Sequence, residues 1–159
     1  MEITYPFEPK SAVRLRPGDF WPIPISGERF GCGRVIALKN PGQTGARSML
    51  IAGLMNWIGS APPTSGDLAG CRTVQQAQVH LRSILETGGV ILGHRALALE
   101  LIEPDLFLSE AKGANCWLMR GYEWLRPATP DEQNSHPVWQ TWGYLIIRHR
   151  AEALAKSAA

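Results

Sequence analysis

Apolar and polar positions alternate along two neighbouring stretches near the N-terminus, residues 20–25 and 29–38. An alternation of period two predicts β-strands, because successive side chains of a strand point to opposite faces. Ser26-Gly27 lies between the two stretches and supplies a turn, since glycine adopts positive φ without steric cost. The pattern therefore predicts a β-hairpin, with Trp21, Ile23 and Ile25 on one face of its first strand.

Pro22 and Pro24 are two residues apart in the first strand, so their missing N–H groups lie on the same side. That side cannot donate hydrogen bonds to a neighbour, which predicts an edge strand. Gly31 and Gly33 of the second strand predict either a bulge or a close approach of another chain segment.

Residues 48–58 are apolar at both alternating sets of positions. This pattern predicts a strand buried on both faces, with a short buried helix as the alternative. Residues 59–70, which are dense in Gly, Pro and Ser, predict an exposed loop.

A helical period follows the loop. Thr73 and Gln76 have the spacing of a capping box, and Gly88-Gly89 supplies a stop. The apolar residues between them are spaced at three and four, which predicts the principal helix. These residues are Val74, Ala77, Leu81, Ile84 and Leu85.

The remaining elements are predicted from shorter patterns. We expect a strand at 90–94, a strand or short helix at 96–104, extended chain at 115–125, a loop at 126–137, a strong strand at 142–150 and a terminal helix or frayed tail at 151–159. The fold class expected is α+β in a single domain, 1–159. It comprises a strongly curved, antiparallel, partly open barrel-like sheet, one principal helix packed on it and a short C-terminal helix.

Composition narrows the class of protein. The 159 residues are 45% hydrophobic and 19% charged, with a net charge of +2 that does not indicate a nucleic-acid partner. Three widely spaced cysteines argue against a disulfide framework and predict thiols used as small hydrophobes in a reducing compartment. The N-terminus lacks a signal-peptide pattern and no stretch is long enough to cross a membrane, which predicts a soluble cytoplasmic protein.

Motifs for catalysis or cofactor binding are missing from the sequence. Gly31-Cys32-Gly33 lacks the third glycine of a dinucleotide fingerprint, there is no P-loop, and the four histidines have no metal-ligand spacing. We therefore expect no cofactor, no metal and no enzymatic activity. A hydrolase would require Glu103, Asp105 and His94 to converge in one pocket.

Six tryptophans are distributed along the chain. Packing in the core is favoured for five of them, whereas Trp139, next to a polar loop, is equally compatible with an interface anchor. An alternative function is a small nucleic-acid-binding β-barrel, in which Arg34, Tyr144, Arg148 and Arg150 would share one face.

The two ends of the chain together resemble the bacterial immunity protein 26 family. The N-terminal match is a P-G-D, an extended strand, a turn and a G-x-V strand, and the C-terminal match is a W-G-x-x-x-I-R segment. The matching residues are Pro17, Gly18, Asp19, Ile23, Pro24, Gly33, Val35, Trp142, Gly143, Ile147 and Arg148. Residues 44–137 match no motif of that family.

The resemblance implies an immunity protein that binds a cognate bacterial toxin and occludes its active site without catalysis. We expect a monomer that binds this toxin and neither a membrane nor nucleic acid, and whose contacts come from loops 59–70 and 126–141. The expected exposed anchors are Asp67, Asp131, Glu132 and Trp139.

Two structural expectations complete this interpretation. Asp19 should accept backbone amides of its turn, since a carboxylate at this position can hydrogen-bond to the nearby main chain. The first hairpin and the last strand should be neighbours, with Trp142-Gly143 against the face of Gly31 and Gly33.

Overall fold

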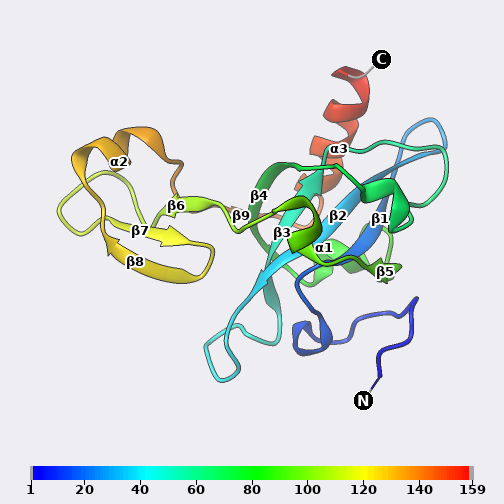
Figure 1. The fold of residues 1–159 in the computed structure, drawn as a ribbon, viewed down its shortest axis with the longest axis horizontal. Helices are drawn as coiled ribbons and strands as arrows, with labels where there is room; N and C mark the ends of the chain where they lie inside the picture. The colour runs from blue at the N-terminus through cyan, green and yellow to red at the C-terminus, as the bar shows by residue number, and fades with distance from the viewer. Residues whose placement is uncertain (1, 158–159) are drawn as a thin grey trace.

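The structure, a computed structural model, describes residues 2–157 and has an α+β fold built on two sheets (Figure 1). The main sheet has the strand order β5-β1-β2-β3-β4-β9. Its strands are β1 (Asp19–Ile25), β2 (Arg29–Leu38), β3 (Met49–Met55), β4 (Thr73–His80), β5 (Gly93–His94) and β9 (Thr141–Trp142). The smaller sheet consists of β6 (Leu106–Leu108), β7 (Trp117–Arg120) and β8 (Glu123–Pro127).

Short helical segments connect the strands and one longer helix ends the chain. The helices are α1 (Arg82–Leu85), α2 (Pro130–Ser135) and α3 (Ile146–Ser157), and the 3-10 turns are η1 (Ala12–Arg14), η2 (Gly66–Leu68) and η3 (Leu97–Glu100). Within the described residues, no helix has the length and apolar character needed to cross a membrane.

The α+β class is confirmed, whereas the expectation of a purely antiparallel sheet is wrong and its partly open, barrel-like shape is not confirmed. The sheet is mixed, because β9 runs parallel to β4 while the other pairs are antiparallel. The strand order is open from β5 to β9, so the described residues form no closed barrel.

The predicted hairpin is confirmed as β1 and β2, which pair from Phe20 with Arg34 to Ile25 with Arg29. Gly27 in the turn has φ +77°, the conformation for which glycine was expected. On its outer side β1 pairs with β5 at only two positions, so most of that edge has no strand partner. Gly88 packs against Pro22 there, where any added Cβ would lie 2.1 Å from the Pro22 carbonyl oxygen.

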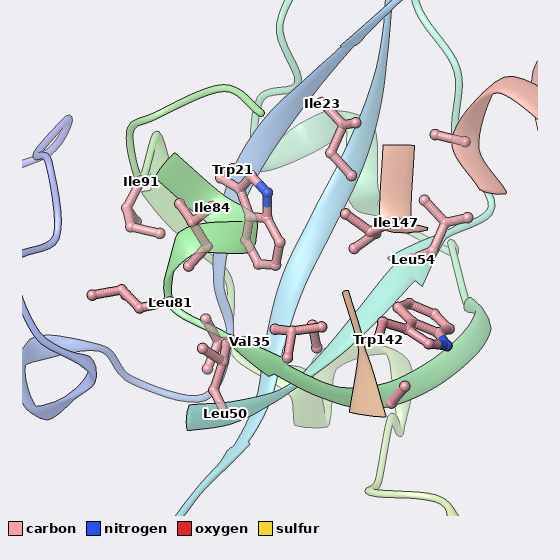
Figure 2. Packing of buried hydrophobic residues seen from close by; sticks show 14 of the residues in the cluster. Trp21, Ile23, Val35, Leu50, Leu54, Leu81, Ile84, Ile91, Trp142 and Ile147 are labelled. Atoms are coloured by element: carbon pink, nitrogen blue, oxygen red, sulfur yellow. The ribbon is translucent and has the colours of Figure 1, made fainter. Parts of the chain in front are cut away.

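Strand β3 is buried along almost its whole length, as predicted, because the main sheet is covered on both faces. One face carries the large core cluster (Figure 2), which includes Trp21 and Ile23 of the hairpin and Ile147 of α3. The other face carries Phe20, Cys32, Met55 and Leu68. Full burial of a large apolar side chain contributes about 1.5–3 kcal/mol, so these two layers hold the sheet together.

The three cysteines are free, and two of them are buried, as expected for thiols that pack as small hydrophobes. Burial raises the pKa of the Cys32 thiol well above its usual range, so this side chain stays neutral in the core.

The predicted principal helix at 73–85 is wrong, because residues 73–80 form strand β4. Only α1 is helical in this region, and it buries Ser83 and Ile84. The predicted glycine stop comes shortly after this helix. Gly89 has φ +81° and donates its amide to Ile84 O at 2.8 Å. The upstream residues were misassigned because Ala77, which alternates with Val79 onto the core side of the strand, also fits the helical spacing with Val74 and Leu81.

The predicted strand at 142–150 is also wrong, because only Thr141–Trp142 is extended and α3 begins at Ile146. Ile147, Ala151 and Ala155 are buried at intervals of four, the spacing of one helical face. The alanines of this segment favour a helix, and their preference outweighs the strand preference of the β-branched pair Ile146-Ile147. The hairpin and the C-terminal segment are nevertheless neighbours. A Cβ at Gly31 would lie 3.0 Å from the Cβ of Ala151, so Gly31 marks the close approach predicted there.

Residues 106–139 form the small lobe, which extends from the main sheet on the left of Figure 1. It contains β6, β7, β8 and α2, although residues 126–137 were predicted to be a loop. Helix α2 begins with a capping box in which the Thr129 side chain accepts from Glu132 N, while Glu132 accepts from Thr129 N. This capping-box pattern, followed by Pro130 at the first helical position, is the signal that the sequence reading missed.

Candidate functional site

The residues that carry the family resemblance occupy framework positions. Gly18 has φ +105°, and a Cβ there would lie 2.5 Å from Arg95 O. Asp19 is fully buried and accepts hydrogen bonds from Tyr5 Oη at 2.7 Å and from Arg16 N at 2.9 Å. The second bond confirms the expected carboxylate-to-turn contact. His94 Nδ1 lies 3.0 Å from the same carboxylate.

The other motif residues also support the fold. Gly33 lies beneath the indole of Trp21. A Cβ at this position would lie 2.3 Å from the indole ring, so no side chain fits there. Trp142 is buried in the core and pairs with Val79 of β4, whereas Gly143 has no close neighbour that requires a glycine. The expected contact of Trp142-Gly143 with the face of Gly31 and Gly33 is therefore wrong. Pro17 is exposed in the turn before β1.

A second polar cluster lies beneath η3. Arg34 is 0% exposed and donates to Arg95 O, and its Nη1 lies 3.5 Å from Glu100 Oε1. Arg95 donates to both oxygens of Glu100, at 2.9 and 2.8 Å. These hydrogen bonds lower the pKa of Glu100, and desolvation lowers the pKa of Arg34. The cluster is a structural ion pair that holds residues 95–100 against β2.

Arg34 lies apart from Tyr144 and Arg150, with which it would share one face in a nucleic-acid-binding protein. Arg150 stacks over Trp142 at 5.1 Å, and Tyr144 is stacked by Arg82 at 5.3 Å. Since Arg34 is buried in an ion pair, it does not share an exposed face with them. The predicted stacking platform on a C-terminal strand is also absent from the described structure, because that segment is helical.

The candidate hydrolase residues do not converge. Glu103 and Asp105 line a cleft of about 520 Å³ between the main sheet and the small lobe, together with Arg120 and His136. His94 instead contacts Asp19. Across residues 2–157, no group of three His, Cys, Asp or Glu side chains is placed to hold a metal ion.

Buried Gln76 organises that cleft. Its side chain donates to Glu103 O at 3.0 Å and accepts from Asp105 N at 2.8 Å, so it fixes the start of the small lobe to β4. Tyr122 makes a second connection by donating its hydroxyl to Gln78 Oε1 at 2.9 Å. Burial raises the pKa of the Tyr122 phenol, which keeps this donor protonated.

One face of the small sheet is aromatic. Phe107, Met119 and Trp124 are cross-strand neighbours on it, and Trp117 packs edge-on against Trp124 with ring centroids 6.0 Å apart. The inner end of this face is closed, because Trp139 packs on Phe107 at 5.5 Å and on Tyr122 at 5.4 Å.

The outer end of the face is open to solvent. Trp117 is 36% exposed and Trp124 is 58% exposed, although the sequence favoured core packing for both. We call Trp117 and Trp124 the outer tryptophan pair. Glu123 and Arg126 of β8 are also exposed, but they pair with Arg120 and Leu118 and therefore point to the opposite face of the sheet. Exposed aromatic side chains of this kind are enriched in protein-binding patches.

The four expected anchors do not form one surface. Asp67 is exposed but accepts hydrogen bonds from the backbone and hydroxyl of Thr64, at 2.9 and 3.0 Å, which stabilises loop 59–70. That loop lies on the right of Figure 1, whereas the small lobe lies on the left. A compact partner seated on one of these regions is remote from the other.

The three remaining anchors belong to the small lobe. Asp131 is exposed in the first turn of α2, where its negative charge interacts favourably with the helix dipole. Glu132 is half-buried in the capping box and pairs with Arg126. Trp139 is half-buried at the joint between lobe and main sheet and donates its amide to Leu108 O at 2.8 Å. The expectation that Glu132 and Trp139 are exposed is therefore wrong.

Comparison with known proteins identifies no relative: no family model, no curated protein and no solved structure matches this chain.

Proposed function

We propose that this protein is an immunity protein, which binds a cognate bacterial toxin and occludes the toxin's active site. The exposed outer tryptophan pair of the small lobe is the observation that carries the proposal. Tryptophan is among the residues most enriched in binding hot spots, because it buries a large area at a small cost in side-chain entropy.

The division of the chain supports this function. Residues that resemble the immunity protein 26 family lie in the main sheet, its turns and α3, and several of them pack in the core or at close backbone approaches. The small lobe falls within the region without motifs of that family. A shared framework with a separate recognition element suits proteins that each neutralise a different toxin.

Occlusion requires a rigid recognition surface, and the lobe supplies one. The inner half of its aromatic face is packed by Phe107, Trp139 and Tyr122, and Tyr122 and Gln76 fasten the lobe to β4. The outer pair is therefore held in place before the toxin arrives, which reduces the entropy lost on binding.

Co-purification and growth test the function together. The tagged protein is co-expressed with the product of the adjacent gene, and the complex is isolated while growth is followed with and without this protein. We expect a tight equimolar complex and growth only when this protein is present. A neighbouring product that is not toxic and forms no complex would contradict the proposal.

A further inference from the structure

The N-terminal groove is a second concave surface, formed by residues 2–10, η1 and the end of the β2–β3 loop. Its volume is about 1000 Å³, at the upper end of the range for ligand sites. Ala12 N donates to Arg47 O at 2.7 Å and Phe7 exchanges two backbone hydrogen bonds with Ile91, so both walls are anchored to the body. The apolar residues that line it are Ile3, Phe7, Val13 and Leu15.

The rim of the groove is cationic. Lys10, Arg14, Arg16 and Arg47 line it against only two acids, Glu2 and Glu8. Within residues 2–157 none of these four cations forms an ion pair, although Arg16 donates to Tyr5 Oη at 2.9 Å. Three guanidinium groups and an ammonium group are thus available to an anionic ligand.

The apolar floor adds a second requirement. Val13 is 59% exposed and lines the groove, so it offers apolar surface to a ligand there. A ligand that satisfied the charges alone would leave this apolar surface in water. The complementary ligand therefore carries both carboxylates and apolar side chains.

We propose that the N-terminal groove binds an extended acidic peptide segment of a partner protein, with apolar side chains on the floor and carboxylates on the cationic rim. The concave shape favours an inserted chain over a flat lipid surface, because the flat face of a bilayer does not reach the floor of a concave surface. The N-terminal segment that lines the groove lies low in Figure 1, apart from the small lobe on the left. This site is therefore independent of the proposed toxin contact.

Fluorescence anisotropy tests the proposal with the full chain and a short labelled peptide in which Glu and Leu alternate. Two comparison peptides separate the contributions: Glu alternating with Ser keeps the charge, and Lys alternating with Leu reverses it. We expect the Glu–Leu peptide to bind at least about tenfold more tightly than either. Its binding should weaken as salt is raised through the range in which surface charges are screened.

Variants locate the binding. The double change Arg14→Glu and Arg47→Glu, and separately Val13→Asp, should each weaken the Glu–Leu peptide by about tenfold or more. Lys112→Glu, a single charge reversal on the small lobe, should leave the affinity unchanged. An unchanged melting temperature of each variant confirms that the fold is intact, since all four side chains are exposed.

Three results would overturn the proposal. They are failure of the Glu–Leu peptide to bind, equal binding by the groove variants and the wild type, and preference for anionic phospholipid vesicles over the peptide. None of them bears on the toxin complex, whose formation is tested separately through the small lobe.

Discussion

The Nη1 atom of Arg34 lies 3.5 Å from Oε1 of Glu100, and Arg34 itself is wholly buried in the middle of β2. Removing one member of a buried pair leaves the other charge uncompensated, which costs about 3–5 kcal/mol. We expect Glu100→Ala to lower the free energy of unfolding by about 3 kcal/mol, measured by urea denaturation.

Arg34→Met is the matched variant for this prediction. It removes the buried charge and keeps much of the side-chain volume, while Glu100 retains its two hydrogen bonds from Arg95. The loss should therefore be smaller than that of Glu100→Ala. A larger loss from Arg34→Met would mean that packing, and not the ion pair, dominates at this position.

The same pair predicts a pH dependence. Hydrogen bonds from Arg95 lower the folded-state pKa of Glu100 below the unfolded value of about 4.3. Its contribution is therefore complete above about pH 5 and is lost as the pH falls through the folded pKa. Urea unfolding of the wild type and of Glu100→Gln between pH 7 and pH 3 isolates the contribution of Glu100. The difference between their free energies of unfolding should shrink below about pH 4.3. A constant difference would argue against the lowered pKa.

Gly18 and Gly42 separate steric exclusion from backbone strain. Both have positive φ, but a Cβ at Gly18 meets Arg95 O at 2.5 Å, whereas a Cβ at Gly42 meets nothing within 4 Å. We expect Gly18→Ala to cost at least about 2 kcal/mol and Gly42→Ala about 1 kcal/mol of stability. Thermal melts of the two variants make the comparison, and equal losses would show that the close approach at Gly18 is unimportant.

The hydroxyl of Tyr122 connects the small lobe to β4 through Gln78. Tyr122→Phe removes this hydrogen bond and should cost about 1 kcal/mol. Tyr144→Phe is the control, because the Tyr144 hydroxyl makes no hydrogen bond within the described residues. Absorbance titration adds a second measurement. The tyrosine missing from Tyr122→Phe should be one that ionises above the ordinary pKa of about 10, since burial raises it.

The first half of the fold could be predicted from the sequence to a large extent. The β1–β2 hairpin follows from strict alternation and a turn glycine, and the double burial of β3 from its continuous apolar run. Local patterns suffice there because each strand pairs with its neighbour along the chain.

The remaining elements depend on contacts that are distant in sequence. The apolar residues of 73–80 fit both the helical and the strand period. These residues form strand β4 because they pair with β3 along the whole strand. Ile146-Ile147 favours a strand locally, but the close approach of Gly31 to Ala151 accommodates a helix on the sheet. Tertiary packing overrides propensity in both cases.

The candidate site was harder to predict than the fold. Which tryptophans are exposed depends on which face of β7 and β8 is covered, and Trp139 covers Phe107 from 32 residues away along the chain. Alternation in the 115–125 segment indicated extended chain but not the covering element. Trp117 and Trp124 were therefore assigned to the core, and Trp139 was named as an anchor instead.

The account depends most on the outer tryptophan pair, so the most direct measurement is the affinity of Trp124→Ala for the neighbouring gene's product. Trp124 is 58% exposed, and truncation should leave the melting temperature nearly unchanged while weakening the complex by about 2 kcal/mol or more, roughly 30-fold. Tyr144→Ala, which truncates a 45% exposed aromatic on the main body, should bind as the wild type does. Equal affinity of Trp124→Ala and wild type would contradict the assignment of the small lobe as the toxin-binding surface.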